Sequence, residues 1–267
     1  MKVCWNLTNI CNEDCVFCFR DLVEPAISLE DNMNILNKLA SLGVSSITYA
    51  GGEPLLYKGI KDLLSYSRYL GIKNNLITNG SLLNKDNLSE YLCNVDKLTF
   101  SIDSPSEYIN ESNGRGKNHY KHIKELLPHI KREFPNLILE INTVATNTDL
   151  QEVDFMFEAI GSELSFYGIK KWKISRFCPL RGYAKERKDF FNIPNDVFES
   201  IKEKYDGRRA MFEVSVRDFD SIEENLVISP QGNFKKAING EEEVLVEGIA
   251  TTGVATLKKS LGGHYVQ

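Results

Sequence analysis

The 267-residue chain contains 42% hydrophobic and 26% charged residues and has a formal net charge of −5. These values are typical of a soluble globular protein of one domain, and the negative balance gives no general attraction for nucleic acid or anionic lipid. No apolar run is long enough to span a membrane, and no basic-then-apolar leader predicts secretion. The six cysteines, a triad plus singles, favour a reducing compartment over a disulfide framework, so we expect a cytoplasmic protein.

Three cysteines follow the first apolar run, residues 3–7, in the string Cys-Asn-Glu-Asp-Cys-Val-Phe-Cys. Cys11, Cys15 and Cys18 can supply three ligands to a [4Fe-4S] cluster that normally takes four, which leaves one iron open. A structural zinc site usually needs paired motifs or nearby histidines, and the histidines lie far downstream. A distant fourth cysteine stays open as an alternative. The remaining cysteines are Cys4, Cys93 and Cys178.

Short apolar or β-branched runs alternate with segments of helical period along most of the chain. Strands are predicted near residues 2–8, 45–50, 73–78, 97–102, 137–144 and 170–176. Helices are predicted between Ser28 and Gly43, then near residues 58–70, 118–134 and 150–160. Pro128 should kink or interrupt the third of these helices. Strands that alternate with helices imply a parallel sheet with right-handed crossovers.

The pattern changes after residue 190. A helix near residues 196–205 precedes a strand at 211–216 and a hairpin over 226–236, which turns at Pro230-Gln231-Gly232-Asn233. The segment from Gly240 carries no motif. We therefore expect a β/α core over residues 1–190 and a short α+β extension over 191–267 that packs on the same domain.

Polar or glycine-rich turns follow several of the predicted strands. After the second, third and fourth strands these turns are Gly51-Gly52-Glu53-Pro54, Thr78-Asn79-Gly80 and Ser101-Ile102-Asp103-Ser104. In parallel β/α folds, ligands bind at the carboxyl ends of the strands. The cysteine triad and these turns are therefore expected to meet at one edge of the sheet.

The C-x3-C-x2-C triad and the Gly-Gly-Glu-Pro turn together closely resemble the radical S-adenosylmethionine (radical SAM) superfamily over roughly residues 1–236. The resemblance implies a partial (β/α)6 barrel and a [4Fe-4S] cluster whose open iron chelates SAM. One electron, from a flavodoxin- or ferredoxin-type donor, would cleave SAM to methionine and a 5′-deoxyadenosyl radical that abstracts hydrogen from the substrate. The protein would supply binding, orientation and exclusion of solvent.

Several residues are candidates for SAM contacts. Gly51 and Gly52 would let the backbone approach the methionine ammonium, and Glu53 would add negative charge there. Arg115, flanked by glycines, would clamp the methionine carboxylate or else be a solvated loop residue. Phe17 resembles the aromatic residue that the superfamily often places against adenine, although it would equally serve to pack the loop. The candidates for the ribose hydroxyls or the methionine end are Asn79, Ser101 and Asp103.

Within the superfamily, several strings resemble viperin-like enzymes, which dehydrate a nucleoside triphosphate to its 3′-deoxy-3′,4′-didehydro form. These strings are Cys11 to Phe19, Gly114-Arg115-Gly116-Lys117-Asn118-His119, Ile141-Asn142-Thr143-Val144 and Trp172-Lys173. Lys171 and Lys173 share one face of the sixth strand, where two ammonium groups can serve a triphosphate. Asn142 and Lys117 are the other candidate substrate contacts.

The chain departs from the viperin-like pattern at Glu140, at Asn225, where the family has an aromatic residue, and over residues 176–182. Glu140 lies where that pattern favours a lysine, so it would repel phosphate or pair with Lys171 or Lys173. A radical SAM enzyme that acts on a peptide or small metabolite is the alternative; auxiliary clusters are not supported, because no cysteine follows Cys178. A cluster protein without radical chemistry, serving as a redox sensor, is a third interpretation. The sequence identifies no catalytic acid or base.

Overall fold

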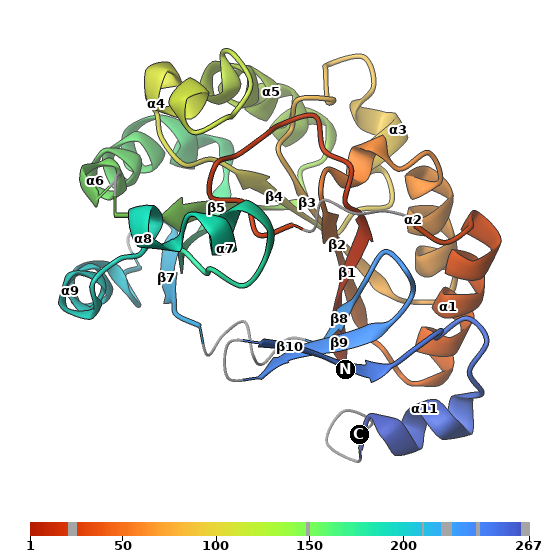
Figure 1. Cartoon of the computed structure of the whole chain (residues 1–267). Coiled ribbons are helices and arrows are strands. Elements are labelled where there is room, and N and C mark those ends of the chain that lie inside the picture. Colours follow the sequence, from red (N-terminus) through yellow and green to blue (C-terminus); the bar gives the residue numbers. More distant parts are fainter. Residues whose placement is uncertain (21–25, 148–149, 210, 220–225, 239–240, 263–267) are drawn as a thin grey trace.

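The computed structural model describes residues 1–20, 26–147, 150–209, 211–219, 226–238 and 241–262. Within these residues ten strands form one curved sheet in the order β10-β9-β8-β1-β2-β3-β4-β5-β6-β7 (Figure 1). The strands are β1 Lys2–Thr8, β2 Ser46–Gly51, β3 Lys73–Thr78, β4 Lys97–Ser101, β5 Ile138–Ala145, β6 Ile169–Arg176, β7 Glu213–Arg217, β8 Val227–Ile228, β9 Phe234–Ile238 and β10 Glu241–Val246.

Strands β1 to β7 pair in parallel, and β8 joins β1 in parallel before β9 and β10 continue antiparallel. Helices cover the outer face of this sheet (Figure 1). The α/β fold class and the six β/α strand positions are thus confirmed, with boundaries within one residue of those predicted. The α-helices are α1 Leu29–Ser41, α2 Ile60–Tyr69, α3 Leu88–Leu92, α4 Glu107–Ser112, α5 His119–Glu133, α6 Leu150–Ala159, α7 Gly182–Glu186, α8 Lys188–Phe191, α9 Asn195–Tyr205 and α11 Val254–Ser260.

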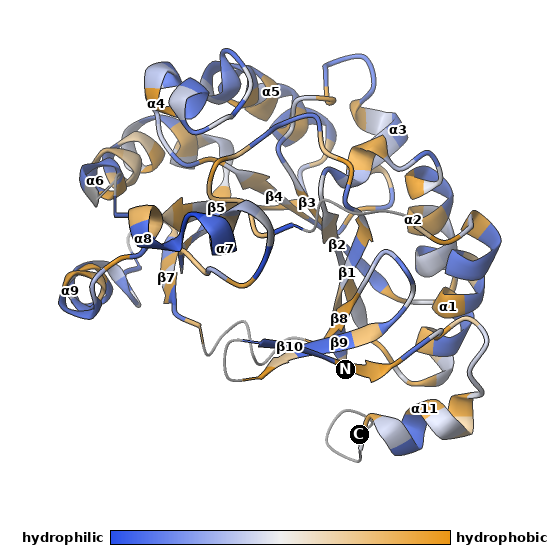
Figure 2. Cartoon of the chain, viewed as in Figure 1, coloured by the Kyte–Doolittle hydropathy of each residue, from blue (hydrophilic) through white to orange (hydrophobic). Residues whose placement is uncertain are grey.

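The helices begin and pack as their sequences direct. The Ser28 side chain caps α1 by accepting a hydrogen bond from the Asp31 N–H at 3.1 Å. The apolar stripes of the helices face the sheet, which Figure 2 shows in orange. Helix α5 is not interrupted at Pro128, contrary to that part of the prediction. Its buried stripe, which includes Ile123 and Leu127, holds the helix against the sheet despite the missing N–H.

The strands present two different faces. In β1, Val3, Trp5 and Leu7 are buried beneath the helices, and each such side chain contributes roughly 1.5–3 kcal/mol of hydrophobic stabilisation. The alternate residues, such as Cys4 and Asn6, line a cavity of about 1050 Å³ on the concave side of the sheet. The core therefore lies between sheet and helices, and the inner face is left for a ligand.

The C-terminal strands extend the same sheet. Strand β7 and the β8–β9 hairpin form close to where they were expected, whereas β10 and α11 were not predicted. Strand β10 is a largely exposed edge strand rich in glutamate, so its sequence lacks the alternation that marks a half-buried strand. Lys38 in α1 donates to the Ile249 and Thr252 carbonyls, which fixes the chain before α11. Among the described residues, no helix is long and apolar enough to cross a membrane.

Candidate active site

The segment of residues 9–20, here called the cysteine loop, crosses the carboxyl ends of the strands directly after β1 (Figure 1). Backbone hydrogen bonds tie it to three other loops. Glu53 N–H donates to Ile10 O at 2.8 Å, and Val16 N–H donates to Asn113 O at 3.0 Å. Ala184 N–H donates to Cys18 O at 3.1 Å. The loop is therefore fixed from the β2 end, the α4 end and α7 together.

Glycines make these contacts possible. A Cβ on Gly52 would lie 2.1 Å from Ile10 O, and one on Gly51 would lie 2.3 Å from Thr8 O. Likewise, a Cβ on Gly114 would lie 2.2 Å from Asp14 O, and one on Gly182 would lie 2.2 Å from Arg20 O. These distances exclude any side chain. The structure thus gives Gly51 and Gly52 a requirement that the sequence did not reveal, the seating of the cysteine loop, while their approach to a methionine ammonium stays a prediction.

The three thiols suit an iron–sulfur cluster. Cys11, Cys15 and Cys18 are all free, and all lie on this one loop. Burial raises the pKa of the Cys15 thiol to about 12, so it is not a reactive thiolate by itself, whereas metal coordination deprotonates a thiol outright. In the described parts of the chain no three His, Cys, Asp or Glu side chains converge on a single metal ion.

Glu53 joins the ends of two neighbouring strands. Its carboxylate is buried and accepts hydrogen bonds from Thr78 Oγ1 at 2.7 Å, Asn79 N–H at 2.8 Å and Leu55 N–H at 3.1 Å. Burial raises its pKa to about 7 although these three donors act in the opposite direction. Asn79 in turn donates to Asn12 Oδ1 in the cysteine loop at 3.0 Å. The Gly-Gly-Glu-Pro turn and the third strand therefore both support the loop.

A buried ionic group, here called the rim cluster, consists of Glu13, Asp103, Arg115 and His119. The Arg115 guanidinium lies 2.7 Å from Asp103 Oδ2 and 3.0 Å from Glu13 Oε2. His119 Nδ1 lies 3.3 Å from Glu13 Oε1, and its Nε2 lies 2.7 Å from Ser101 O. Burial acts to raise the pKa of Glu13, but His119 and Arg115 outweigh it and lower the pKa to about 2.

The rim cluster gives several predicted residues a definite place. Arg115 is not a solvated loop residue, because it bridges two carboxylates in the interior. A methionine carboxylate would have to share its guanidinium with Glu13 and Asp103, so the clamp role stays a prediction. Phe17 is buried in a small cluster with Phe177 and Phe191, so it packs the loop in this structure. Its contact with adenine also stays a prediction.

The cavity beneath this rim is strongly basic. Seven cations line it against three carboxylates, so its lining carries four more positive than negative charges, in a chain whose overall charge is negative. Among these, Lys2, Lys73 and Arg217 form no ion pair with any described residue. The seven cations are Lys2, Arg68, Lys73, Lys97, Lys173, Arg181 and Arg217, and the three carboxylates are Asp96, Glu133 and Glu242.

The substrate residues predicted from sequence do not all meet in the cavity. Lys173 lines it, but Lys171 pairs with Glu213 at 2.8 Å and is not part of the lining. Asn142 is half-buried and accepts from Ser175 Oγ at 3.0 Å. Lys117 lines a separate cavity of about 360 Å³ beside His119 and His122, so the structure does not bring it together with Lys173. A role for Lys117 at the same ligand is therefore not supported.

Glu140 pairs with Lys173, one of the two outcomes expected from the sequence. It also lies 3.4 Å from Lys97 Nζ, and Thr99 Oγ1 donates to it at 3.4 Å. Lys97, Glu140 and Lys173 are here called the wall cluster, because they stand on the adjacent strands β4, β5 and β6.

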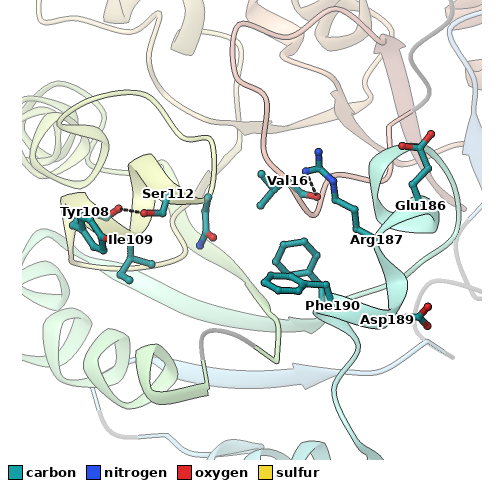
Figure 3. A pocket seen from close by; sticks show the side chains of 10 residues that line it. Val16, Tyr108, Ile109, Ser112, Glu186, Arg187, Asp189 and Phe190 are labelled. Atoms are coloured by element: carbon teal, nitrogen blue, oxygen red, sulfur yellow. Dashed lines mark hydrogen bonds between the residues drawn. The ribbon is translucent and has the colours of Figure 1, made fainter.

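The cysteine loop also reaches the outer surface. Val16, between Cys15 and Cys18, lies at a cavity of about 760 Å³ bounded by α4 and α8 (Figure 3). Arg187 donates to Val16 O at 3.3 Å, and Phe190 and Tyr108 expose most of their side chains there. The cavity therefore reaches the cysteine loop at the segment between Cys15 and Cys18.

The cations at the strand starts were missed by the sequence analysis. Lys2, Lys73 and Lys97 each open a strand and share its inner face with polar residues. That regularity, a lysine at the first inward position of three strands, was available in the sequence. Arg217 carried no such signal, because its place depends on β7 joining the sheet.

Comparison with known proteins agrees with this geometry. The family model described as "Radical SAM superfamily" matches residues 5–158. A curated "S-adenosylmethionine-dependent nucleotide dehydratase" from Flammeovirga pacifica is 27% identical over 99% of this chain and 91% of its own length. A second protein of that name, from Lacinutrix mariniflava, is 26% identical over 87% of this chain, which spans only 50% of that relative.

Among solved structures, SuiB from Streptococcus suis bound to S-adenosylmethionine matches with a TM-score of 0.71 and 17% identity. The match covers 96% of this chain and 65% of SuiB, and at that identity it shows the fold alone. The family match covers the cysteine loop and the first five strands, where it implies SAM and a [4Fe-4S] cluster. The chain belongs to the radical SAM superfamily.

Proposed function

We propose that this radical SAM enzyme dehydrates a nucleoside triphosphate to its 3′-deoxy-3′,4′-didehydro form. The basic cavity beneath the cysteine loop carries the proposal, because a polyphosphate is the common metabolite group that best matches an excess of cations around one cavity, among which Lys173 is buried and Lys97, Arg181 and Arg217 are half-buried. The relatives named nucleotide dehydratases support it independently.

Residues near the cysteine loop would bind the cofactors, and residues deeper in the barrel would bind the substrate. Cys11, Cys15 and Cys18 would hold the cluster, which when bound supplies the electron that cleaves SAM to a 5′-deoxyadenosyl radical. The rim cluster, with Asn79 and Ser101, would orient SAM. Lys173 and the unpaired cations below would hold the phosphates, so that a ribose carbon faces the rim. The ribose hydroxyl would then leave as water by taking up a proton, and a second electron from the external donor would reduce the remaining ribose radical to the closed-shell didehydro product.

Both electrons, one for SAM cleavage and one for the substrate radical, must come from an external donor. We expect a flavodoxin- or ferredoxin-type donor to approach beside Val16, where the cysteine loop meets the cavity of Figure 3. We favour this surface because the electron donor must lie a short distance from the [4Fe-4S] cluster.

The test is anaerobic incubation of the reconstituted, dithionite-reduced protein with SAM and, separately, CTP, UTP, GTP and ATP. Mass spectrometry should detect 5′-deoxyadenosine that depends on one nucleotide, and a product lighter by one water. The Cys15→Ala protein, treated identically, should release none. If 5′-deoxyadenosine forms slowly and equally with every nucleotide, the enzyme is a radical SAM protein with another kind of substrate.

A further inference from the structure

The wall cluster places a buried carboxylate among the cations of the cavity. Glu140 is 6% exposed and contacts Lys173, Lys97 and Thr99. Both lysines line the cavity, on strands either side of Glu140. Burial acts to raise the pKa of Glu140, but Lys173 and Lys97 outweigh it and lower the pKa, so this group is a carboxylate at neutral pH.

This arrangement reduces the charge that a ligand meets. Two ammonium groups share one carboxylate, so the wall cluster carries a single net positive charge in place of two. An anion bound to both lysines would also lie close to Glu140, where little water screens the repulsion. The repulsion grows with every charge that the ligand places near Lys97 and Lys173. By contrast, Lys2, Lys73 and Arg217 have no carboxylate partner among the described residues and attract an anion without this opposing effect.

We propose that Glu140 is a specificity-determining residue that limits how strongly the cavity discriminates between ligands by their number of phosphate groups. The inference rests on the proposed function in taking this cavity as the nucleotide site. It predicts that the wild-type cavity gains less affinity from the second and third phosphates than a cavity without the Glu140 charge would, so the ribose and base contribute more to the choice of nucleotide.

The experiment measures binding of inorganic tripolyphosphate and of orthophosphate to the reconstituted protein by anaerobic calorimetry. Glu140→Gln keeps the side-chain shape and removes the charge, so tripolyphosphate should bind about tenfold more tightly, with a smaller gain for orthophosphate. The matched control is Glu90→Gln, which makes the same charge change beside Lys61 on the outer helices, 3.0 Å away. The control should leave both affinities unchanged.

A second variant keeps the test decisive if Glu140→Gln does not fold. Lys97→Met leaves Glu140 with Lys173 alone and should weaken tripolyphosphate binding severalfold, the opposite sign. Unchanged or weaker tripolyphosphate binding in Glu140→Gln would overturn the inference, because Glu140 would then only position the lysines. Absence of tripolyphosphate binding in both proteins would overturn it as well.

These probes contain no nucleoside and require no turnover. If Glu140→Gln binds tripolyphosphate more tightly but no nucleotide stimulates release of 5′-deoxyadenosine, the proposed reaction is wrong and the role of Glu140 is supported. If Glu140→Gln binds tripolyphosphate no more tightly but a nucleotide does stimulate release of 5′-deoxyadenosine, the role of Glu140 is wrong and the proposed reaction is supported.

Discussion

The rim cluster and the wall cluster are built from the same chemical groups in opposite proportions. In the rim cluster, Arg115 is shared by Glu13 and Asp103, so carboxylates exceed the guanidinium. In the wall cluster, Glu140 is shared by Lys97 and Lys173, so cations exceed the carboxylate. SAM carries a net positive charge and a nucleoside triphosphate a negative one. The rim cluster therefore suits a cationic ligand, and the wall cluster suits an anionic one.

The two clusters also differ in how firmly they are held. The rim cluster lies against the cysteine loop, which glycine contacts and backbone hydrogen bonds fix from three sides. The wall cluster depends on side chains that stand on a regular sheet, where a single substitution changes the charge without moving the backbone. Substitutions in the rim cluster should therefore affect assembly of the [4Fe-4S] cluster and the stability of the fold. Substitutions in the wall cluster should affect ligand binding alone.

The largest effect is expected at the cysteines themselves. Cys15→Ala removes one of the three proposed protein ligands, so the reconstituted protein should lack the iron, the sulfide and the broad visible absorbance of a [4Fe-4S] cluster. Circular dichroism should show that it is folded. Cys93→Ala is the matched control, because Cys93 is exposed at the end of α3, far in sequence from the loop. Retention of the cluster in Cys15→Ala would show that this thiol is not a ligand.

Arg115→Met tests the rim cluster. Removing the guanidinium leaves Glu13 and Asp103 buried without their shared cation, which costs about 3–5 kcal/mol of unfolding free energy. Denaturant unfolding of the apo protein measures the loss. Arg132→Met is the control, because Arg132 forms an exposed pair with Glu133 at 2.8 Å, and its loss should cost less than about 1 kcal/mol. Similar losses for the two variants would mean that the rim cluster does not stabilise the fold.

Gly114→Ala tests the seating of the cysteine loop. Gly114 and Gly71 have nearly equal φ angles, +81° and +78°, so an alanine is strained alike at both. Only at Gly114 would the new Cβ meet another backbone, Asp14 O at 2.2 Å. We expect Gly114→Ala to lose roughly 2 kcal/mol more unfolding free energy than Gly71→Ala. Equal losses would show that the loop yields freely at this contact.

The contrast between the clusters also marks the limit of prediction from sequence. The strands and their order along the chain follow from local periodicity, which is why β1 to β6 were placed within one residue. The cysteine loop follows from a short local motif. The rim cluster does not, because Glu13 and Arg115 are 102 positions apart and only the packed loops bring them together.

Glu140 lies between these cases. Its departure from the viperin-like pattern was visible in the sequence, and so were the two lysines with which it could pair. Which lysine it would choose was not visible, because Lys171 has its own partner, Glu213, on the next strand. That partner belongs to β7, a strand outside the six β/α units. The charge of the wall cluster therefore depends on Glu213, which lies on a strand outside the repeating β/α pattern.

The smallest effect is expected at the wall. Lys173→Ala removes one cation that lines the cavity, so the nucleotide should bind about tenfold more weakly, or about 1.4 kcal/mol, while SAM binding is unchanged. Anaerobic calorimetry with each ligand measures both. Lys171→Ala is the matched variant on the same strand; because Lys171 is engaged by Glu213 outside the cavity lining, its loss should weaken nucleotide binding less. Equal weakening of SAM and nucleotide binding in Lys173→Ala would contradict this prediction. It would mean that Lys173 affects both ligand sites, and that the wall cluster does not bind the nucleotide separately from a SAM site at the rim cluster.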